Sequence, residues 1–97
     1  MADFLLRPAA VADLKQAYKW YQGERPGLGE EFLQAVRASV DRAVAGPGAY
    51  AVVHRDTRRV LVRRFPYGMF FRIVDGTVVF VACFHLHRKP ASWKRRR

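Results

Sequence analysis

The chain has 97 residues, 51 % of them hydrophobic, and carries a formal net charge of +10 at pH 7. This length suits one domain, and this apolar content excludes a wholly disordered chain. No apolar stretch approaches the roughly 20 residues of a membrane-spanning helix, and MADFLLRPAA lacks the pattern of a secretion signal. The single cysteine, Cys83, has no partner for an internal disulfide. We therefore expect one cytoplasmic domain, residues 1–97, that binds no membrane.

The first half of the chain predicts a short strand and two helices. The strand is DFLLR (3–7), and Pro8 suits a first helical position because no helical partner awaits its missing N–H. The first helix should end near Gly23, and Gly46-Pro47-Gly48 should end the second. Only the turn ERPGLG separates them, which predicts an antiparallel hairpin. The apolar stripes are Val11, Leu14, Tyr18 and Tyr21 in the first helix, and Leu28, Phe32, Val36, Val40 and Ala43 in the second. Trp20 and Tyr21 are expected to belong to the packing of this hairpin.

The second half changes to the period of β-strands. Three runs are rich in β-branched and aromatic residues: 58–65, 68–74 and 77–85. Asp75-Gly76 between the last two predicts a tight hairpin turn, and 54–56 read as a loop before the first run. The order β-α-α-β-β-β predicts an α+β fold with the helical hairpin on one face of a small, mainly antiparallel sheet.

The last predicted strand is apolar on both faces. Strict alternation places Val79, Val81 and Cys83 on one face and Phe80 and Phe84 on the other. Because a helical hairpin covers only one face, something else must cover the face of Phe80 and Phe84. The sequence leaves two alternatives: the chain's own terminal segments, or a partner chain.

The positive charge is concentrated in the C-terminal half. Residues 1–50 contain six Lys or Arg and six Asp or Glu, whereas residues 51–97 contain twelve Lys or Arg and two acids. This excess indicates a polyanionic or acidic partner, or else a basic surface that serves solubility alone. Residues 94–97 form a basic tail, either solvated or part of a contact.

Three motifs occur in a characteristic order: WY before PGLG and Phe32, RRFPY before an aromatic strand, and H-x-x-R-x-P-x-x-W from His85 to Trp93. From about Pro8 to Trp93 the sequence resembles the RelE/ParE superfamily of toxins of type II toxin–antitoxin systems, and it is most similar to the ParE-like or plasmid stabilization branch. The resemblance implies a hetero-oligomer with a cognate antitoxin whose C-terminal segment is acidic. It also implies a target, either DNA gyrase for ParE-like members or the ribosome for RelE-like ones.

The resemblance and the charge together suggest which residues make contacts. The residues expected to contact the target or nucleic acid are Arg59, Arg63, Arg64, Arg88, Lys89 and Trp93. Those expected to contact the antitoxin are Arg72, Phe80 and Phe84. Trp93 has a second interpretation, in which it anchors the C-terminal tail to the sheet.

A ribosome-dependent mRNA endoribonuclease is the alternative function. RNA cleavage without metal requires activation of a 2′-hydroxyl, stabilisation of the phosphorane charge and protonation of the leaving oxygen. The candidates are Arg63, Tyr67, His85 and Arg88. Gly68 departs from the pattern, because active ribonuclease relatives tend to carry arginine there. An inactive or repurposed nucleic-acid-binding module of the same fold is a third possibility.

A metal site is conceivable but disfavoured. Cys83, His85 and His87 alternate along one strand, but three ligands spread over ~13 Å cannot converge on one ion at ~2 Å. We expect neither a metal nor another cofactor.

Overall fold

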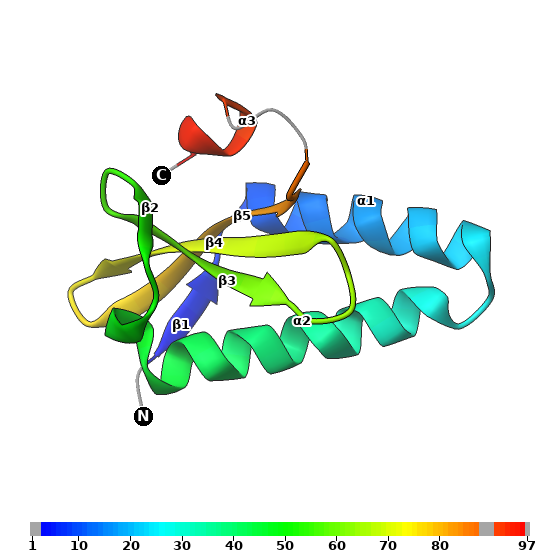
Figure 1. Ribbon diagram of the computed structural model, residues 1–97, viewed down its shortest axis with the longest axis horizontal. Helices are drawn as coiled ribbons and strands as arrows, with labels where there is room; N and C mark the ends of the chain where they lie inside the picture. Colours follow the sequence, from blue (N-terminus) through cyan, green and yellow to red (C-terminus); the bar gives the residue numbers. More distant parts are fainter. Residues whose placement is uncertain (1–2, 88–90, 97) are drawn as a thin grey trace.

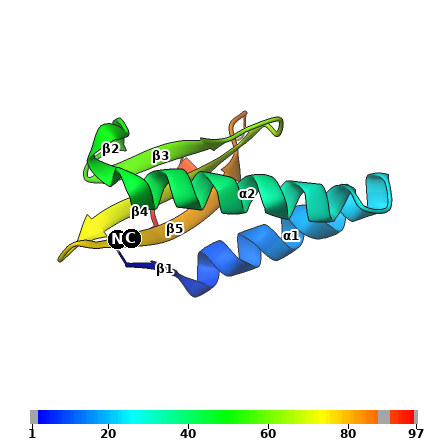
Figure 2. The same ribbon diagram turned by 90° about the horizontal axis from the view of Figure 1, so that it is seen from below.

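The computed structural model describes residues 3–87 and 91–96 of the chain, and it shows two layers (Figures 1 and 2). A five-stranded sheet carries a pair of long antiparallel helices on one face. In chain order the elements are β1 (Phe4–Leu6), α1 (Pro8–Glu24), α2 (Leu28–Ala45), a 3₁₀ turn (Pro47–Ala49), β2 (Val52–His54), β3 (Thr57–Val62), β4 (Tyr67–Val74), β5 (Thr77–His85) and α3 (Ala91–Lys94).

The strand order across the sheet is β1-β5-β4-β3-β2. β1 runs parallel to β5, and every other pair is antiparallel. The predicted α+β fold, with a helical hairpin on one face of a mainly antiparallel sheet, is therefore confirmed. The helices and the sheet enclose the main core, whose largest fully buried side chains include Phe32, Phe71 and Phe80.

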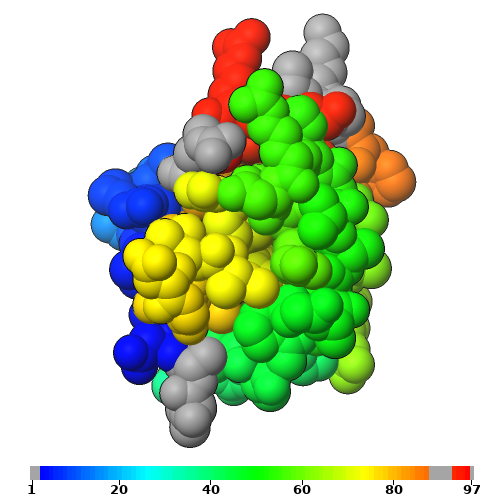
Figure 3. Space-filling model, turned by 90° about the vertical axis from the view of Figure 1, so that its left-hand side faces the viewer, coloured from blue at the N-terminus to red at the C-terminus, as the bar shows by residue number. Residues whose placement is uncertain are grey.

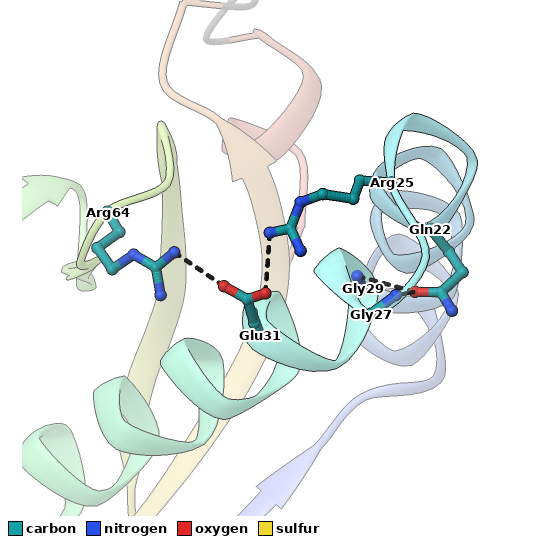
Figure 4. A network of polar contacts seen from close by, with 6 residues as sticks. All are labelled: Gln22, Arg25, Gly27, Gly29, Glu31 and Arg64. Atoms are coloured by element: carbon teal, nitrogen blue, oxygen red, sulfur yellow. Dashed lines mark hydrogen bonds and ion pairs between the residues drawn. The ribbon is translucent and has the colours of Figure 1, made fainter.

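The turn between the helices depends on two glycines. Gly27 has φ of +91°, a left-handed conformation that glycine adopts without steric cost. Gly29 passes so close to α1 that a Cβ there would lie 2.8 Å from ring atoms of Tyr18. The Gln22 side-chain oxygen accepts hydrogen bonds from the Gly27 amide (3.2 Å) and the Gly29 amide (3.0 Å), as Figure 4 shows. These bonds satisfy amides that the start of α2 would otherwise leave unpaired.

The strand predictions need two corrections. His54 was predicted in a loop, but it ends β2, which pairs with β3 through a tight turn at Arg55 and Asp56. Three residues give too weak a periodicity for such a strand to be recognised. The strand predicted over 58–65 ends at Val62, because Arg63 to Pro66 form the turn into β4.

The predicted faces of β5 are also partly wrong, because the strand contains a bulge. Phe70 pairs with Ala82 but Phe71 pairs with Phe80, so Val81 is the extra residue between them. Before the bulge, Phe80 points into the core beneath the helices, where it is 0 % exposed; after it, Cys83 does so. Phe80 therefore does not lie on the second face, and it presents no surface to an antitoxin.

The second face of the sheet is covered by the chain's own C-terminal segment. Trp93 stacks on Phe70 with the ring centroids 4.3 Å apart and the ring planes at 19°. Together with Val79, Val81 and Ala82 they form a second, smaller core. Trp93 also lies edge-on to His54, 6.2 Å away, and Figure 3 shows the red C-terminal segment above the green β2–β3 region. The first alternative, cover by the chain's own ends, is thus confirmed for the C-terminal segment, whereas the N-terminal strand lies at the edge of the sheet, beside β5.

No helix in the described parts of the chain is both long enough and apolar enough to span a membrane.

Candidate functional site

A hollow of about 460 Å³ opens where β4 begins and β5 ends, against the side of α1. We name it the aromatic pocket. Its lining residues are Trp20, Tyr21, Pro66, Tyr67, His85 and His87. The pocket therefore combines two residues of α1 with the Pro66–Tyr67 turn and the histidines at the end of β5.

Tyr67 and His85 lie together in this pocket because they are direct partners in the β4–β5 pairing. Their rings are 5.3 Å apart, edge to face. The Tyr67 ring also packs against Phe32 at 5.2 Å, which fixes its position from the core side. The backbone amide of His87 donates to His85 Nδ1 at 3.2 Å. In the neutral imidazole, the proton is therefore on Nε2.

The role of Trp20 was also predicted wrongly. It was expected in the hairpin packing, but it is 60 % exposed, and its indole lies edge-to-face with the Tyr21 ring at 5.0 Å. It forms a rim shared by the aromatic pocket and a smaller hollow of about 190 Å³ beside Asp13 and Cys83. The helical periodicity could have shown this exposure. Successive residues of a helix are rotated by about 100°, so Trp20 lies outside the apolar stripe that ends with Tyr21.

Of the arginines predicted to contact the target, the three that the structure describes (Arg59, Arg63 and Arg64) do not line the pocket of Tyr67 and His85. Arg63 lines a separate groove at the outer edge of β3, together with Arg42 and Arg59. The described residues that line the aromatic pocket include no lysine or arginine. Arg88 and Lys89 lie outside the described residues, so their assignment remains a prediction.

Arg64 points toward α2 and not toward the aromatic pocket. Its Nη2 lies 3.0 Å from one oxygen of Glu31, while Arg25 binds the other oxygen at 2.9 Å (Figure 4). These two hydrogen bonds lower the pKa of the Glu31 carboxyl below its ordinary value. Arg64 thus ties the β3–β4 turn to the start of α2.

The remaining predicted contact residues are partly occupied within the chain. Arg72 holds Asp56 through two hydrogen bonds of 3.0 and 2.7 Å, which raise the pKa of its guanidinium. Trp93 is only 9 % exposed and so offers little surface to a nucleic-acid base. Phe84 is half-buried beneath the guanidinium of Arg96, 4.9 Å from its ring centre.

Cys83 faces the core, and burial raises the pKa of its thiol. In the metal-free chain it is therefore protonated near neutral pH. The described side chains include no group of three His, Cys, Asp or Glu that could hold a metal ion.

Comparison with known proteins identifies the family. The profile of the family described as "ParE toxin of type II toxin-antitoxin system, parDE" matches residues 4–90. The chain belongs to this family. The predicted membership of the RelE/ParE superfamily of type II toxins is thus confirmed.

A solved structure, described as "Chromosomal ParDE TA system from P. aeruginosa", has the same fold as this ParE-family toxin. The TM-score is 0.79 and the sequence identity 21 %, over 90 % of this chain and 98 % of the other. A search of the curated proteins gave no match. The family match ends at residue 90, before α3 and the contacts of Trp93 and Arg96.

Proposed function

We propose that this ParE-family toxin inhibits DNA gyrase in the cytoplasm and is neutralised by a cognate antitoxin with an acidic segment. The observation that carries the choice of target is the separation of Arg63 from the Tyr67–His85 pair. A toxin that acts by binding gyrase needs a shaped surface, and it does not need a cation beside a general acid. The exposed Trp20 on the rim of the aromatic pocket is the kind of side chain that anchors protein contacts.

The ribosome-dependent endoribonuclease is supported by one observation, the contact between Tyr67 and His85. A histidine at a pocket wall suits proton transfer to or from a ribose. The reaction also needs positive charge at the phosphorane, which no described lining residue of this pocket provides. Among the predicted arginines, only Arg88 remains for that role, so this function ranks second.

Neutralisation by an antitoxin is supported by the charge of the chain. The excess of +10 lies wholly in residues 51–97. Within the described residues, the acids of this half are Asp56, which is bound by Arg72, and Asp75. An acidic partner segment would relieve the repulsion among the remaining cations. The toxin would then exist as a hetero-oligomer until the antitoxin is removed.

Expression of the chain alone in bacteria tests the function. Gyrase inhibition predicts growth arrest with an SOS response and gyrase-linked DNA breaks. Arrest with cleaved ribosome-bound mRNA and intact chromosomes would replace gyrase inhibition with the ribonuclease. Normal growth with folded protein would favour the non-toxic module.

Arg88 and Lys89 enter the proposal as target contacts. Arg88→Ala should reduce toxicity without a change in the unfolding midpoint, and Lys89→Ala should do so more weakly. Arg37→Ala, which removes an exposed cation from α2, is the matched control and should retain full toxicity. An Arg88→Ala variant with full toxicity would remove Arg88 from the site.

A further inference from the structure

The outer edge of β3 loses its neighbouring strand partway along its length. β2 pairs with β3 only through Val52–Arg58 and His54–Thr57, whereas β3 continues to Val62. From Arg59 onward, no strand in the described chain lies on that side of β3. Figure 1 shows β2 turning away from β3 there. Such an edge exposes backbone donors and acceptors to an added strand.

A hydrogen bond shows which backbone groups face this edge. The Leu61 carbonyl accepts from Nη2 of Arg42 on α2 at 2.8 Å, so it points away from β4. In an antiparallel strand the N–H and C=O of one residue point to the same side, and alternate residues share that side. The backbone groups of Arg59 and Leu61 therefore both face the open edge.

The side chains along this edge form a repeating pattern. A groove of about 450 Å³ follows it, lined by Arg42, Arg59, Arg63 and neighbouring apolar side chains. Leu61 is 49 % exposed between Arg59 and Arg63. Neither of these two arginines forms an ion pair with any described residue. Arg59 and Leu61 thus lie on one face of β3, ~6.7 Å apart, and Arg63, the first residue of the turn after β3, lines the same groove.

We propose that this edge of β3 receives an extended acidic segment of the antitoxin. Two carboxylates four positions apart would lie near Arg59 and Arg63, with the apolar side chain midway between them opposite Leu61. The inference rests on the proposed function in that it takes the antitoxin as the partner. Cross-strand pairs of opposite charge and of apolar side chains both stabilise strand pairing.

The edge fits a peptide better than a nucleic acid. The Leu61 carbonyl accepts from Arg42 in the free chain, and a peptide N–H is a donor that can take the place of that guanidinium in an added strand. The phosphates of a nucleic-acid backbone only accept, and they leave an exposed leucine without an apolar partner. A peptide strand satisfies the carbonyl, the leucine and the two cations together.

Two peptides of equal composition test the proposal. The probe Thr-Glu-Thr-Val-Thr-Glu-Thr places its carboxylates four residues apart, on one face with the valine. The control Thr-Thr-Glu-Val-Glu-Thr-Thr has the same net charge, but its carboxylates are only two positions apart and lie on the face opposite the valine. In an NMR titration of the full chain, the probe should shift the amides of Arg59 and Leu61 and bind about tenfold more tightly than the control.

Variants of the chain assign the binding to the edge. The double variant Arg59→Glu with Arg63→Glu should bind the probe about tenfold more weakly. Arg37→Glu on α2 should leave the affinity for the probe unchanged. Leu61→Lys removes the apolar contact and places a charge that discourages strand addition. It should weaken binding even though both arginines remain.

The proposal is overturned if the two peptides bind equally, or if the probe shifts other amides. It is also overturned if a single-stranded 12-nucleotide DNA shifts the amides of Arg59 and Leu61 and the probe does not. The titration does not depend on toxicity. The proposed binding of a peptide at the β3 edge and the proposed inhibition of gyrase are therefore tested independently. If the chain inhibits gyrase but does not bind the probe, only the proposed binding surface at β3 is contradicted. If the chain binds the probe but does not inhibit gyrase, the binding surface is supported and gyrase is contradicted as the target.

Discussion

Asp13 near the start of α1 holds Arg96 near the end of the chain. Nη1 of Arg96 lies 2.8 Å from Oδ2 of Asp13, and Nη2 lies 3.2 Å from Oδ1. The same carboxylate accepts the backbone amide of Cys83 at 3.0 Å. This amide lies on the part of β5 beyond its pairing with β1, which ends at Phe80. Asp13 thus replaces a missing strand neighbour and fixes the segment that carries Trp93.

Asp13→Asn should lower the free energy of unfolding by about 2 kcal/mol, because it leaves a partly buried guanidinium without its counter-charge. The Asp13 side chain is 10 % exposed and that of Arg96 27 %. Urea denaturation followed by circular dichroism measures the change. Asp41→Asn, which alters an exposed acid of α2, should cost less than about 0.5 kcal/mol.

A double-mutant cycle separates this ion pair from a general effect of charge. If the two side chains act together, Asp13→Asn with Arg96→Gln should cost about as much as the more damaging single change. Additive losses would show that Asp13 and Arg96 act independently.

Gly29→Ala should destabilise the helical hairpin by about 1–3 kcal/mol, because the new methyl group must displace Tyr18 or Gln22. A Cβ there would lie 2.8 Å from the Tyr18 ring atoms and from Gln22 Oε1. The matched control is Gly23→Ala in α1, where a Cβ meets nothing within 4 Å. That change should raise stability by about 0.5 kcal/mol, since alanine favours the helix. Equal effects in thermal unfolding would contradict the close packing at Gly29.

Trp20→Ala should reduce inhibition of the target while the fold remains stable. The side chain is 60 % exposed, so its loss should change the unfolding free energy by less than about 1 kcal/mol. If Trp20 anchors the target, about tenfold more protein should be needed for the same inhibition. Leu33→Ala, another exposed apolar residue but on α2, should inhibit like the unaltered chain. Unchanged potency of Trp20→Ala would exclude the aromatic pocket as the contact surface.

Acid should release the contact between Glu31 and its two arginines. Because Arg25 and Arg64 lower the pKa of Glu31 from the ordinary value of 4.5, the folded state binds its proton less readily than the unfolded state. Its stabilising contribution is therefore complete above about pH 5 and is lost as the pH falls through the lowered folded-state pKa. The unfolding midpoint of Glu31→Gln should thus fall less between pH 5 and pH 3. Carbon-detected NMR titration of the carboxyl group measures the pKa, and a value at or above 4.5 would contradict the contact.

Local signals predicted much of the fold. Pro8 begins α1, Gly46 follows α2, and Asp75-Gly76 forms the β4–β5 turn. Each of these residues imposes a backbone conformation or a break within a few positions. That is why the element order and the α+β class could be obtained from the sequence.

Features that depend on distant partners could not be obtained in this way. The bulge at Val81 arises from how β4 and β5 pair, and without it Phe80 was assigned to the wrong face. The contact of Asp13 with Arg96 joins residues 83 positions apart, and no local pattern indicates it. For the site, Tyr67 and His85 were named separately as candidate residues, and only the pairing of β4 with β5 shows that they are neighbours. That Arg63 lies apart from the Tyr67–His85 pair depends on the position of β3 in the sheet, which the sequence does not give.

The most direct test of gyrase inhibition is the supercoiling of relaxed plasmid DNA by purified gyrase in the presence of the purified chain. We expect supercoiling to stop as the chain is added and to resume when the cognate antitoxin is supplied. Full supercoiling at a large excess of folded chain, together with cleavage of ribosome-bound mRNA by the same preparation, would contradict gyrase as the target.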